Sequence, residues 1–523
     1  MDIEKIKKLR TIITENLRTQ KGGVEGIEYI DVFHALTDML AKQNHVVYGR
    51  RGCGKSLLLS DTEKKIPKDV GVVYLNCEDY KNHSFPNVLI EIIDAVFLKL
   101  ESNLTAWFGP EKNLKKIIKD LRREMISLKS QPDERAENVK ETVTHESAAR
   151  DSSGLSVSGQ LKSTVGEINS DLNIETTTSS QVTAEIEREY QNADSKVKRL
   201  SLKIPELKRQ IVEFFRISNK TKSVFIEIDD FYHVARLVQP YVVDYIHRLC
   251  KDVPLYFKIA TLRNSSSLFV ERQGQPVGIQ QRHDYQAINI DYSFQSFEKT
   301  SEQLKKIFLA FAAKADISEE EFDSLFKGVG FRRLVMAGGG VPRDCLSLFL
   351  ELLVAAETSG EKIGKDEVRI LSFDNFQTRI VELKDDSEKK DQVSLIKGIY
   401  VLRQFCLEKK TNIIMISDEM LQKNDALRKL ISRLLDYRII HLVTSATTHK
   451  SYSGTFAAYM IDIGCYANLR KLQGKMNEID VSDARSKDEL RATPVLNEVS
   501  VYDLWKSAPD NPEVALLEEP INI

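Results

Sequence analysis

The sequence predicts an α/β fold, with a parallel sheet covered by helices, followed by a smaller α+β domain. Three observations predict it. Apolar strand-like segments alternate with helical patterns between residues 45 and 290, a glycine-rich turn directly follows the first strand, and two aspartates end a later one. Such alternation is typical of a parallel sheet, because each helix carries the chain back to the edge where the next strand begins.

Five segments of the first domain have the composition of buried strands: residues 45–48, 70–76, 223–228, 255–260 and 287–290. Helical spacing of apolar residues covers 3–17, 29–41 and 85–100. Between about 103 and 197 a basic helix at 112–129, which we interpret as a solvated surface, gives way to a Ser/Thr/Gly-rich stretch. We interpret this region as an insertion. Alternating segments at 155–158 and 172–175 fit a hairpin or a flexible loop equally.

Composition excludes several classes of protein. The chain has 523 residues, enough for about three domains, and its net charge of −2 provides no chain-wide positive field for nucleic acid or a membrane surface. The six cysteines show neither a CxxC pair nor metal-ligand spacing, so we expect buried free thiols. The charged N-terminus and the lack of an apolar run of roughly 18 residues predict a cytoplasmic protein with no membrane contact.

The turn after the first strand carries the pattern G-x-x-x-x-G-K-S and leads at once into a helical segment. Its residues, with the one that follows, are Gly49, Arg50, Arg51, Gly52, Cys53, Gly54, Lys55, Ser56 and Leu57. In this context the pattern predicts a P-loop, or Walker A motif. Its backbone N–H groups face phosphates, Lys55 reaches the β and γ oxygens, and the Ser56 hydroxyl binds Mg²⁺. The sequence therefore predicts binding of ATP with Mg²⁺.

The strand at 223–228 ends in Asp229 and Asp230, the pattern of a Walker B motif. A carboxylate at a strand tip can hold Mg²⁺ through its water shell, and its neighbour can polarise the attacking water. We assign Asp229 to the metal and Asp230 to the water. Acidic strand ends also occur as plain turn signals, so this assignment depends on the P-loop. The lone histidines, His233 and His283 among them, receive no role.

Together these segments, the polar residues 261–264 after the fourth strand and the helix opening at 340–343 resemble the AAA+ ATPases. The likeness is greatest to the origin-recognition initiators and the related signalling (STAND-like) ATPases, and it covers about residues 25–465 without the insertion. It implies a P-loop NTPase core with a helical lid, followed by an α+β winged-helix domain. The implied domains are an N-terminal helical segment at 1–44, the core at 45–295, the lid at 296–385, the winged helix at 386–472 and a polar, irregular tail at 473–523.

The resemblance also implies further site residues. Asn264, or else Thr261, would be the polar sensor of the γ-phosphate, although Asn264 could instead cap a turn. Arg343 would be the sensor arginine of the lid, with a solvated surface arginine as the alternative. An arginine from a neighbouring subunit would complete the site, with Arg282 the favoured candidate and Arg272 the competitor. The chain would then assemble with itself or with a partner ATPase subunit.

The C-terminal region has helical patterns at 393–407, 416–422 and 426–437 and strand patterns at 439–443 and 456–463. Three helices closed by a hairpin are the pattern of a winged helix. Basic side chains between about 428 and 450, namely Arg428, Lys429, Arg433 and Lys450, could contact DNA. Winged helices also dock proteins, and such charges are often only solvated, so both kinds of partner stay open.

Our leading interpretation is an ATP-hydrolysing AAA+ machine that couples its nucleotide state to assembly and to DNA binding. One departure from the family matters: Asp230 stands where the family usually has Glu, and it reaches about one methylene less far. The second interpretation is therefore a nucleotide-gated signalling switch with slow hydrolysis that acts on a partner protein, for example in bacterial defence. A binding protein with an inactive ATPase core is the third. A metabolic kinase is disfavoured, because no second substrate pocket can be identified.

Overall fold

The computed structural model describes residues 3–17, 27–31, 34–81, 83–106, 108–131, 194–218, 220–272, 274–291, 293–387, 389–467, 477–481 and 486–517. The alternating segments predicted at 155–158 and 172–175 lie outside these residues. Among the described helices, none is long and apolar enough to cross a membrane.

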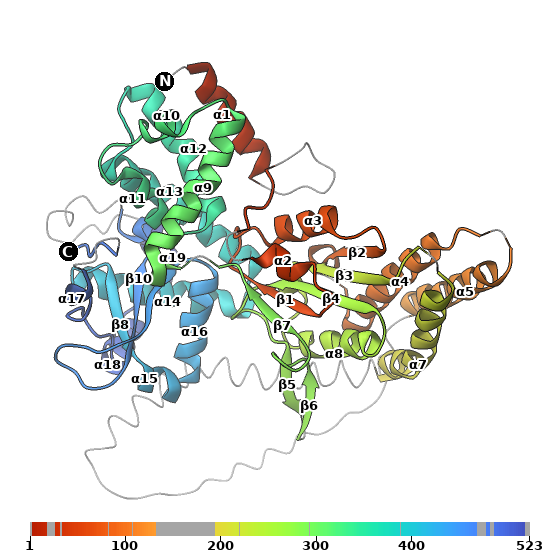
Figure 1. Cartoon of the computed structure of the whole chain (residues 1–523). Coiled ribbons are helices and arrows are strands. Elements are labelled where there is room, and N and C mark those ends of the chain that lie inside the picture. The colour runs from red at the N-terminus through yellow and green to blue at the C-terminus, as the bar shows by residue number, and fades with distance from the viewer. Residues whose placement is uncertain are drawn as a thin grey trace, which may run out of the picture.

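A five-stranded parallel sheet forms the centre of the first half, in the order β2-β3-β4-β1-β7 (Figure 1). The strands are β1 (His45–Tyr48), β2 (Val70–Asn76), β3 (Ser223–Asp229), β4 (Leu255–Thr261) and β7 (Gln286–Asn289). All five lie within one residue of the predicted positions. Because β4 separates β1 from β3, the residues that follow β4 lie between the glycine-rich turn and the acidic strand end.

Helices cover both faces of this sheet. Val47 packs with α2 (Ala35–Met39) and α3 (Lys55–Lys65), whereas its neighbour Val46 packs in the cluster that contains α4 (Phe85–Asn103) and α8 (Gln239–Cys250). Alternate residues of a strand face opposite sides, so apolar residues at both positions require two helical layers. The predicted helix at 29–41 is shorter than expected, because residues 27–31 form no helix and the Tyr29 N–H donates to Asp61 at 2.5 Å.

Two long helices, α5 (Pro110–Ser130) and α7 (Asp194–Ile217), pack on α4 and extend to one side of the sheet (Figure 1). On α5 the buried residues recur every three or four positions: Leu114, Ile118, Leu121, Met125 and Leu128. This stripe faces the neighbouring helices, while the basic side chains face outward. The predicted insertion thus begins and ends in ordered helices that share the core of the sheet.

A short antiparallel hairpin, β5 (Phe269–Arg272) with β6 (Gln275–Gly278), projects between β4 and β7. Sequence patterns did not predict it, because its residues are mostly exposed and lack an alternating apolar pattern.

A second apolar core begins after the sheet. The helices that form it are α9 (Phe297–Lys314), α10 (Glu319–Asp323), α11 (Gly330–Ala337), α12 (Pro342–Ser359) and α13 (Lys365–Asp386). The N-terminal helix α1 (Ile3–Asn16) packs against α9 and α12 of this core (Figure 1). Gly339 and Gly340 have φ of 62° and 71°, which explains the predicted chain break before α12.

The next part contains α14 (Lys389–Glu408), β8 (Ile413–Ser417), α15 (Asp418–Lys423), α16 (Asp425–Asp436), β9 (Ile440–Thr447) and β10 (Phe456–Ile461). The three strands form an antiparallel sheet in the order β8-β10-β9. The predicted helix at 416–422 was wrong at its start. Residues 413–416 are all buried and form a strand, and the helix begins only at Asp418, where the Ser417 hydroxyl caps it.

The predicted irregular tail was also wrong. It contains α17 (Ser486–Leu490), α18 (Glu498–Lys506) and α19 (Pro512–Leu517), and the last two pack on α14. The tail also runs along the edge of β8, where the Met415 N–H donates to the Pro494 carbonyl at 3.0 Å. One apolar cluster joins α1, the helices from α9 to α13, the second sheet and the tail. The boundaries predicted within this part therefore stay a prediction.

Candidate functional site

The glycine-rich turn joins β1 to α3 in the geometry predicted for a P-loop. Gly52 and Gly54 have φ of 87° and 91°, a conformation that side chains with a Cβ rarely adopt. At Gly52 the lack of space gives a second reason for glycine, because an added Cβ would lie 2.8 Å from the Cβ of Arg343. The turn is therefore both tightly curled and covered by the start of α12.

Lys55 is the first residue of α3, and its ammonium is turned back over the loop. It donates to the carbonyls of Gly49 at 2.8 Å and of Arg50 at 3.2 Å. Both partners are neutral, and the side chain is buried at 5% exposure. Its hydrogen-bond partners carry no charge, although the Asp229 carboxylate is close enough to interact with it, so phosphate oxygens could replace the two carbonyls as charged partners.

Asp229, at the end of β3, lies beside Ser56. It accepts hydrogen bonds from the Ser56 hydroxyl and, at 3.0 Å, from the hydroxyl of Tyr74 on β2. Burial, followed by the nearby Asp230 charge, raises the pKa of Asp229, while Ser56 and Lys55 oppose that rise. Hydroxyl and carboxylate oxygens are ligands that suit Mg²⁺, so Ser56 and Asp229 fit the metal role predicted for them.

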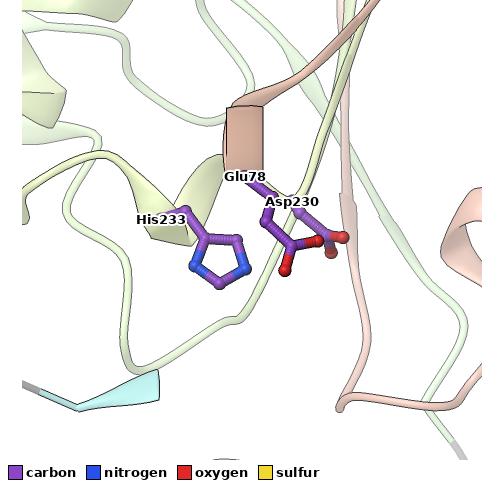
Figure 2. A group of neighbouring side chains, drawn as sticks. All are labelled: Glu78, Asp230 and His233. Carbon is purple, nitrogen blue, oxygen red and sulfur yellow. The ribbon is translucent and has the colours of Figure 1, made fainter. Parts of the chain in front are cut away.

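Asp230 lies close to Glu78 and His233, two residues to which the sequence analysis gave no role. Its φ of 48° is left-handed, and its N–H donates to the Asp229 carboxylate at 2.9 Å. Glu78 lies in the short helix η1 (Cys77–Tyr80) after β2, and His233 lies in η2 (Phe231–His233) after β3. The carboxylate oxygens of Glu78 and Asp230 and the imidazole nitrogen of His233 lie within 4.8 Å of one another (Figure 2). Burial lowers the pKa of His233, so its imidazole is neutral near pH 7.

The second half of the chain contacts the P-loop directly. Arg51 pairs with Asp386 at the end of α13, and the Gly52 carbonyl accepts the N–H of Arg343 at 3.3 Å. The guanidinium of Arg438, from the turn after α16, donates to the Arg51 carbonyl at 3.4 Å. These contacts bring α12, α13 and the turn after α16 onto one loop.

Arg50 makes the fourth connection. It pairs with Asp291 at 2.8 Å and donates to the Gly339 carbonyl at 3.0 Å, and its NH1 lies 3.3 Å from Nδ1 of His441. The sequence analysis placed Arg50 and Arg51 in the loop but could not predict these partners, because they are about 240 to 390 residues away in the chain.

Arg343 differs from the other arginines of the site. Among the described residues its guanidinium forms no hydrogen bond or ion pair. Burial, together with the charges of Arg438 and Arg51, lowers its pKa. The charges of Asp344 and Glu382 oppose this shift without pairing with Arg343, so a phosphate held against Gly52 could become the direct partner of its guanidinium.

Asn264 follows β4, as predicted, but its side chain is held by the second half of the molecule. Asp436 at the end of α16 accepts from the Asn264 N–H and side-chain amide at 2.9 and 3.0 Å. It also accepts from the Ser265 N–H and hydroxyl at 2.6 and 2.8 Å. The alternative candidate, Thr261, is buried, and its hydroxyl bonds to that of Ser266 at 2.5 Å.

We expect Asp436→Ala to destabilise the fold by about 2–3 kcal/mol, because the half-buried backbone N–H groups of Asn264 and Ser265 would lose their acceptor. The measurement is chemical denaturation of the full chain. The control is Asp425→Ala at the exposed start of the same helix, for which we expect a change below about 1 kcal/mol. Equal losses in both variants would contradict the role assigned to Asp436.

The two arginines considered for a neighbouring subunit lie on the hairpin side of the sheet. Arg282 is exposed in a left-handed turn, with φ of 72°, and Arg272 is half-buried over the ring of Tyr241. Neither lies among the P-loop contacts described above, and their role in trans stays a prediction. The six cysteines are free and buried, as predicted.

No protein-family model and no curated protein matches this chain. Among solved structures, the chain is similar to one in the structure of Drosophila ORC bound to DNA. The match covers 88% of this chain and 91% of the ORC chain, at 11% sequence identity and a TM-score of 0.33. The chain is also similar to the K64R mutant of Thermotoga maritima RuvB. That match covers 37% of this chain and 55% of the RuvB chain, at 14% sequence identity and a TM-score of 0.20. Neither similarity assigns a family, so the function has to come from the residues of the chain itself.

Proposed function

We propose that this chain is an AAA+-type ATPase that works as a nucleotide-gated switch, in which bound ATP with Mg²⁺ changes how the second half of the molecule sits on the P-loop. One observation carries the proposal: Asp386, Arg343 and Arg438, all from the second half, contact Arg51 or Gly52 of the loop. A phosphate group in that loop would compete for the same arginines. Nucleotide state and domain position are therefore coupled through shared partners.

The catalytic roles follow the geometry of the loop. Lys55 and the backbone N–H groups of residues 49–57 would hold the phosphates, and Ser56 and Asp229 would hold Mg²⁺. When bound, Mg²⁺ would neutralise phosphate charge and orient the γ-phosphate. Arg343 would contact the γ-phosphate from the lid, and Asp230 would polarise the attacking water. These assignments remain proposals, as do Asn264 as the polar sensor and Arg282 as the arginine supplied to a neighbouring subunit.

A second function, DNA binding, is supported by the order of α14, β8, α15, α16, β9 and β10, which fits the order that we expect of a winged helix. The charges argue against it. On α16, Arg428 and Lys429 share Asp425, and Arg433 pairs with Asp391 of α14 at 2.7 Å with only 15% of its side chain exposed. Of these four predicted contacts, Lys450 alone is exposed without a recorded ion pair among the described residues, so few of the cations are left to contact phosphates. We therefore propose that a protein partner, or another copy of the chain, is what the switch acts on.

Three measurements on the full chain test this proposal: MgATP affinity, single-turnover hydrolysis with and without single- and double-stranded DNA, and small-angle scattering with and without ATP. A switch binds ATP, hydrolyses it slowly without response to DNA, and changes its radius of gyration. Hydrolysis that rises several-fold with DNA would favour the machine instead. Tight ATP binding with an unchanged scattering curve would contradict the switch.

We expect Asp386→Ala to tighten MgATP binding by about tenfold, or roughly 1.4 kcal/mol, because phosphates would no longer compete with a carboxylate for Arg51. Isothermal titration with a slowly hydrolysed ATP analogue measures it. Asp385→Ala is the matched control, because this neighbouring carboxylate is exposed and makes no side-chain contact with Arg51. A weaker or unchanged affinity in Asp386→Ala would show that the pair does not oppose nucleotide.

A further inference from the structure

Within the part of the chain that the structure describes, Glu78, Asp230 and His233 form a cluster of reactive side chains that the roles above do not fully use (Figure 2). Its position follows from the sheet. Asn76 of β2 and Asp229 of β3 are register partners on neighbouring parallel strands, so the chain leaves both strands at the same edge. Glu78 and Asp230 are the second and first residues beyond this pair.

Local structure holds the two carboxylates together. The Asn76 side chain accepts the Glu78 N–H at 3.0 Å and starts η1, while the left-handed turn at Asp230 starts η2. The two short helices pack against each other. The Asp230 carboxylate is thereby turned toward Glu78, while Asp229 keeps its contacts with Ser56 and Tyr74.

This arrangement addresses the short reach of Asp230. A carboxylate that polarises water must lie within hydrogen-bond distance of it, and Asp reaches about one methylene less far than Glu. Glu78 adds a longer side chain at the same place, from a separate turn. It is exposed, whereas Asp230 and His233 are half-buried, so Glu78 lies on the solvent side of the cluster, where water enters.

We propose, resting on the ATPase function above, that Glu78 is a second catalytic carboxylate, which shares with Asp230 the task of orienting and deprotonating the attacking water. The water oxygen forms a bond to the γ-phosphorus, and the bond from that phosphorus to the bridging oxygen breaks, leaving its electron pair on ADP. The water proton passes to the carboxylate pair and then to the released phosphate.

The test compares Glu78→Gln with Asp79→Asn, a matched change at the next residue of η1, which does not belong to the cluster. The readouts are the single-turnover rate of ATP hydrolysis and the MgATP dissociation constant. We expect Glu78→Gln to lower the rate by roughly tenfold to 100-fold with the dissociation constant unchanged, and Asp79→Asn to keep the rate within about twofold. Adding Asp230→Glu to Glu78→Gln should recover most of the rate, because one longer side chain then supplies the missing reach.

Equal rates in Glu78→Gln and Asp79→Asn would overturn the proposal, as would a loss of MgATP affinity in place of rate, since that would make Glu78 part of binding. A double variant no faster than Glu78→Gln alone would overturn the shared-reach argument. Failure of the underlying function would look different. In that case the unmodified chain would neither bind nor hydrolyse MgATP, and every variant would give the same result.

Discussion

Replacing Lys55 by Ala is expected to weaken MgATP binding by at least about 100-fold, or roughly 2.7 kcal/mol. The ammonium is buried, it begins α3 beneath the loop, and its present partners are two carbonyls without charge. Charge-assisted bonds to phosphate oxygens in such a site are worth about twice as much as bonds between neutral groups. Their loss affects the bound state only, so the free protein should keep most of its stability.

Calorimetric titration of the full chain with a slowly hydrolysed ATP analogue and Mg²⁺ gives the affinity, and a melting curve without nucleotide gives the stability. Lys64→Ala serves as the control, because this lysine lies on the same helix with 62% of its side chain exposed. If the affinity of Lys55→Ala for MgATP stays within a few-fold of that of the unmodified chain, the loop does not bind the phosphates as proposed. It would also remove the proposals that depend on it.

The predictable part of the site is the part encoded locally. A strand, a glycine turn and a helix N-terminus occupy consecutive residues, and Asp229 is the last of the seven buried residues of β3. Parallel pairing then has to bring Asp229 to the same edge as Ser56, because both follow carboxyl ends of strands in one sheet. The central sheet could be predicted for the same reason: buried strands have a composition that surface segments lack.

The unpredicted part depends on contacts between distant segments. Asp386, Arg438 and Asp436 belong to no recognisable motif, and their roles arise only where the second half of the chain meets the P-loop and β4. The sequence analysis gave Glu78 no role, because nothing in its own segment shows that Asp230 will lie beside it. The left-handed conformation of Asp230 does that, and an aspartate before an aromatic residue is no specific signal for it.

The errors in the C-terminal region have a similar origin. The stretch at 413–416 is too short to separate a strand from the first turn of a helix by periodicity, and its partner β10 lies about 40 residues later. The tail is polar on average, yet Leu496, Val501, Trp505 and Leu516 are buried against the second core. Isolated apolar residues of this kind form helices through tertiary packing rather than through a strong local pattern.

The second large effect is expected at Arg379, whose replacement by Met should destabilise the protein by about 3–5 kcal/mol. This arginine of α13 is 1% exposed, pairs with Asp344 at 3.0 Å and with Asp462, and donates to the carbonyls of Ala337 and Arg438. Met fills a similar volume but leaves two buried carboxylates short of a counter-charge. The variant thus measures the loss of the ion pairs more than the loss of packing.

Arg379 also joins the two parts of the second half, because Asp344 belongs to α12 whereas Asp462 follows β10. Asp344 in turn holds Arg438 at 2.5 Å, the residue that contacts the P-loop. The measurement is the free energy of unfolding in urea, for Arg379→Met and for the control Arg332→Met. Arg332 forms an ion pair with Glu298 at the surface, so we expect its replacement to cost below about 1 kcal/mol. If the two variants lose the same stability, the network does not hold the second half together. The coupling would be supported by two results together: only Arg379→Met loses much stability, and saturating MgATP no longer changes the scattering curve of this variant. In that case Asp344, Arg379 and Asp462 couple the P-loop to the C-terminal sheet.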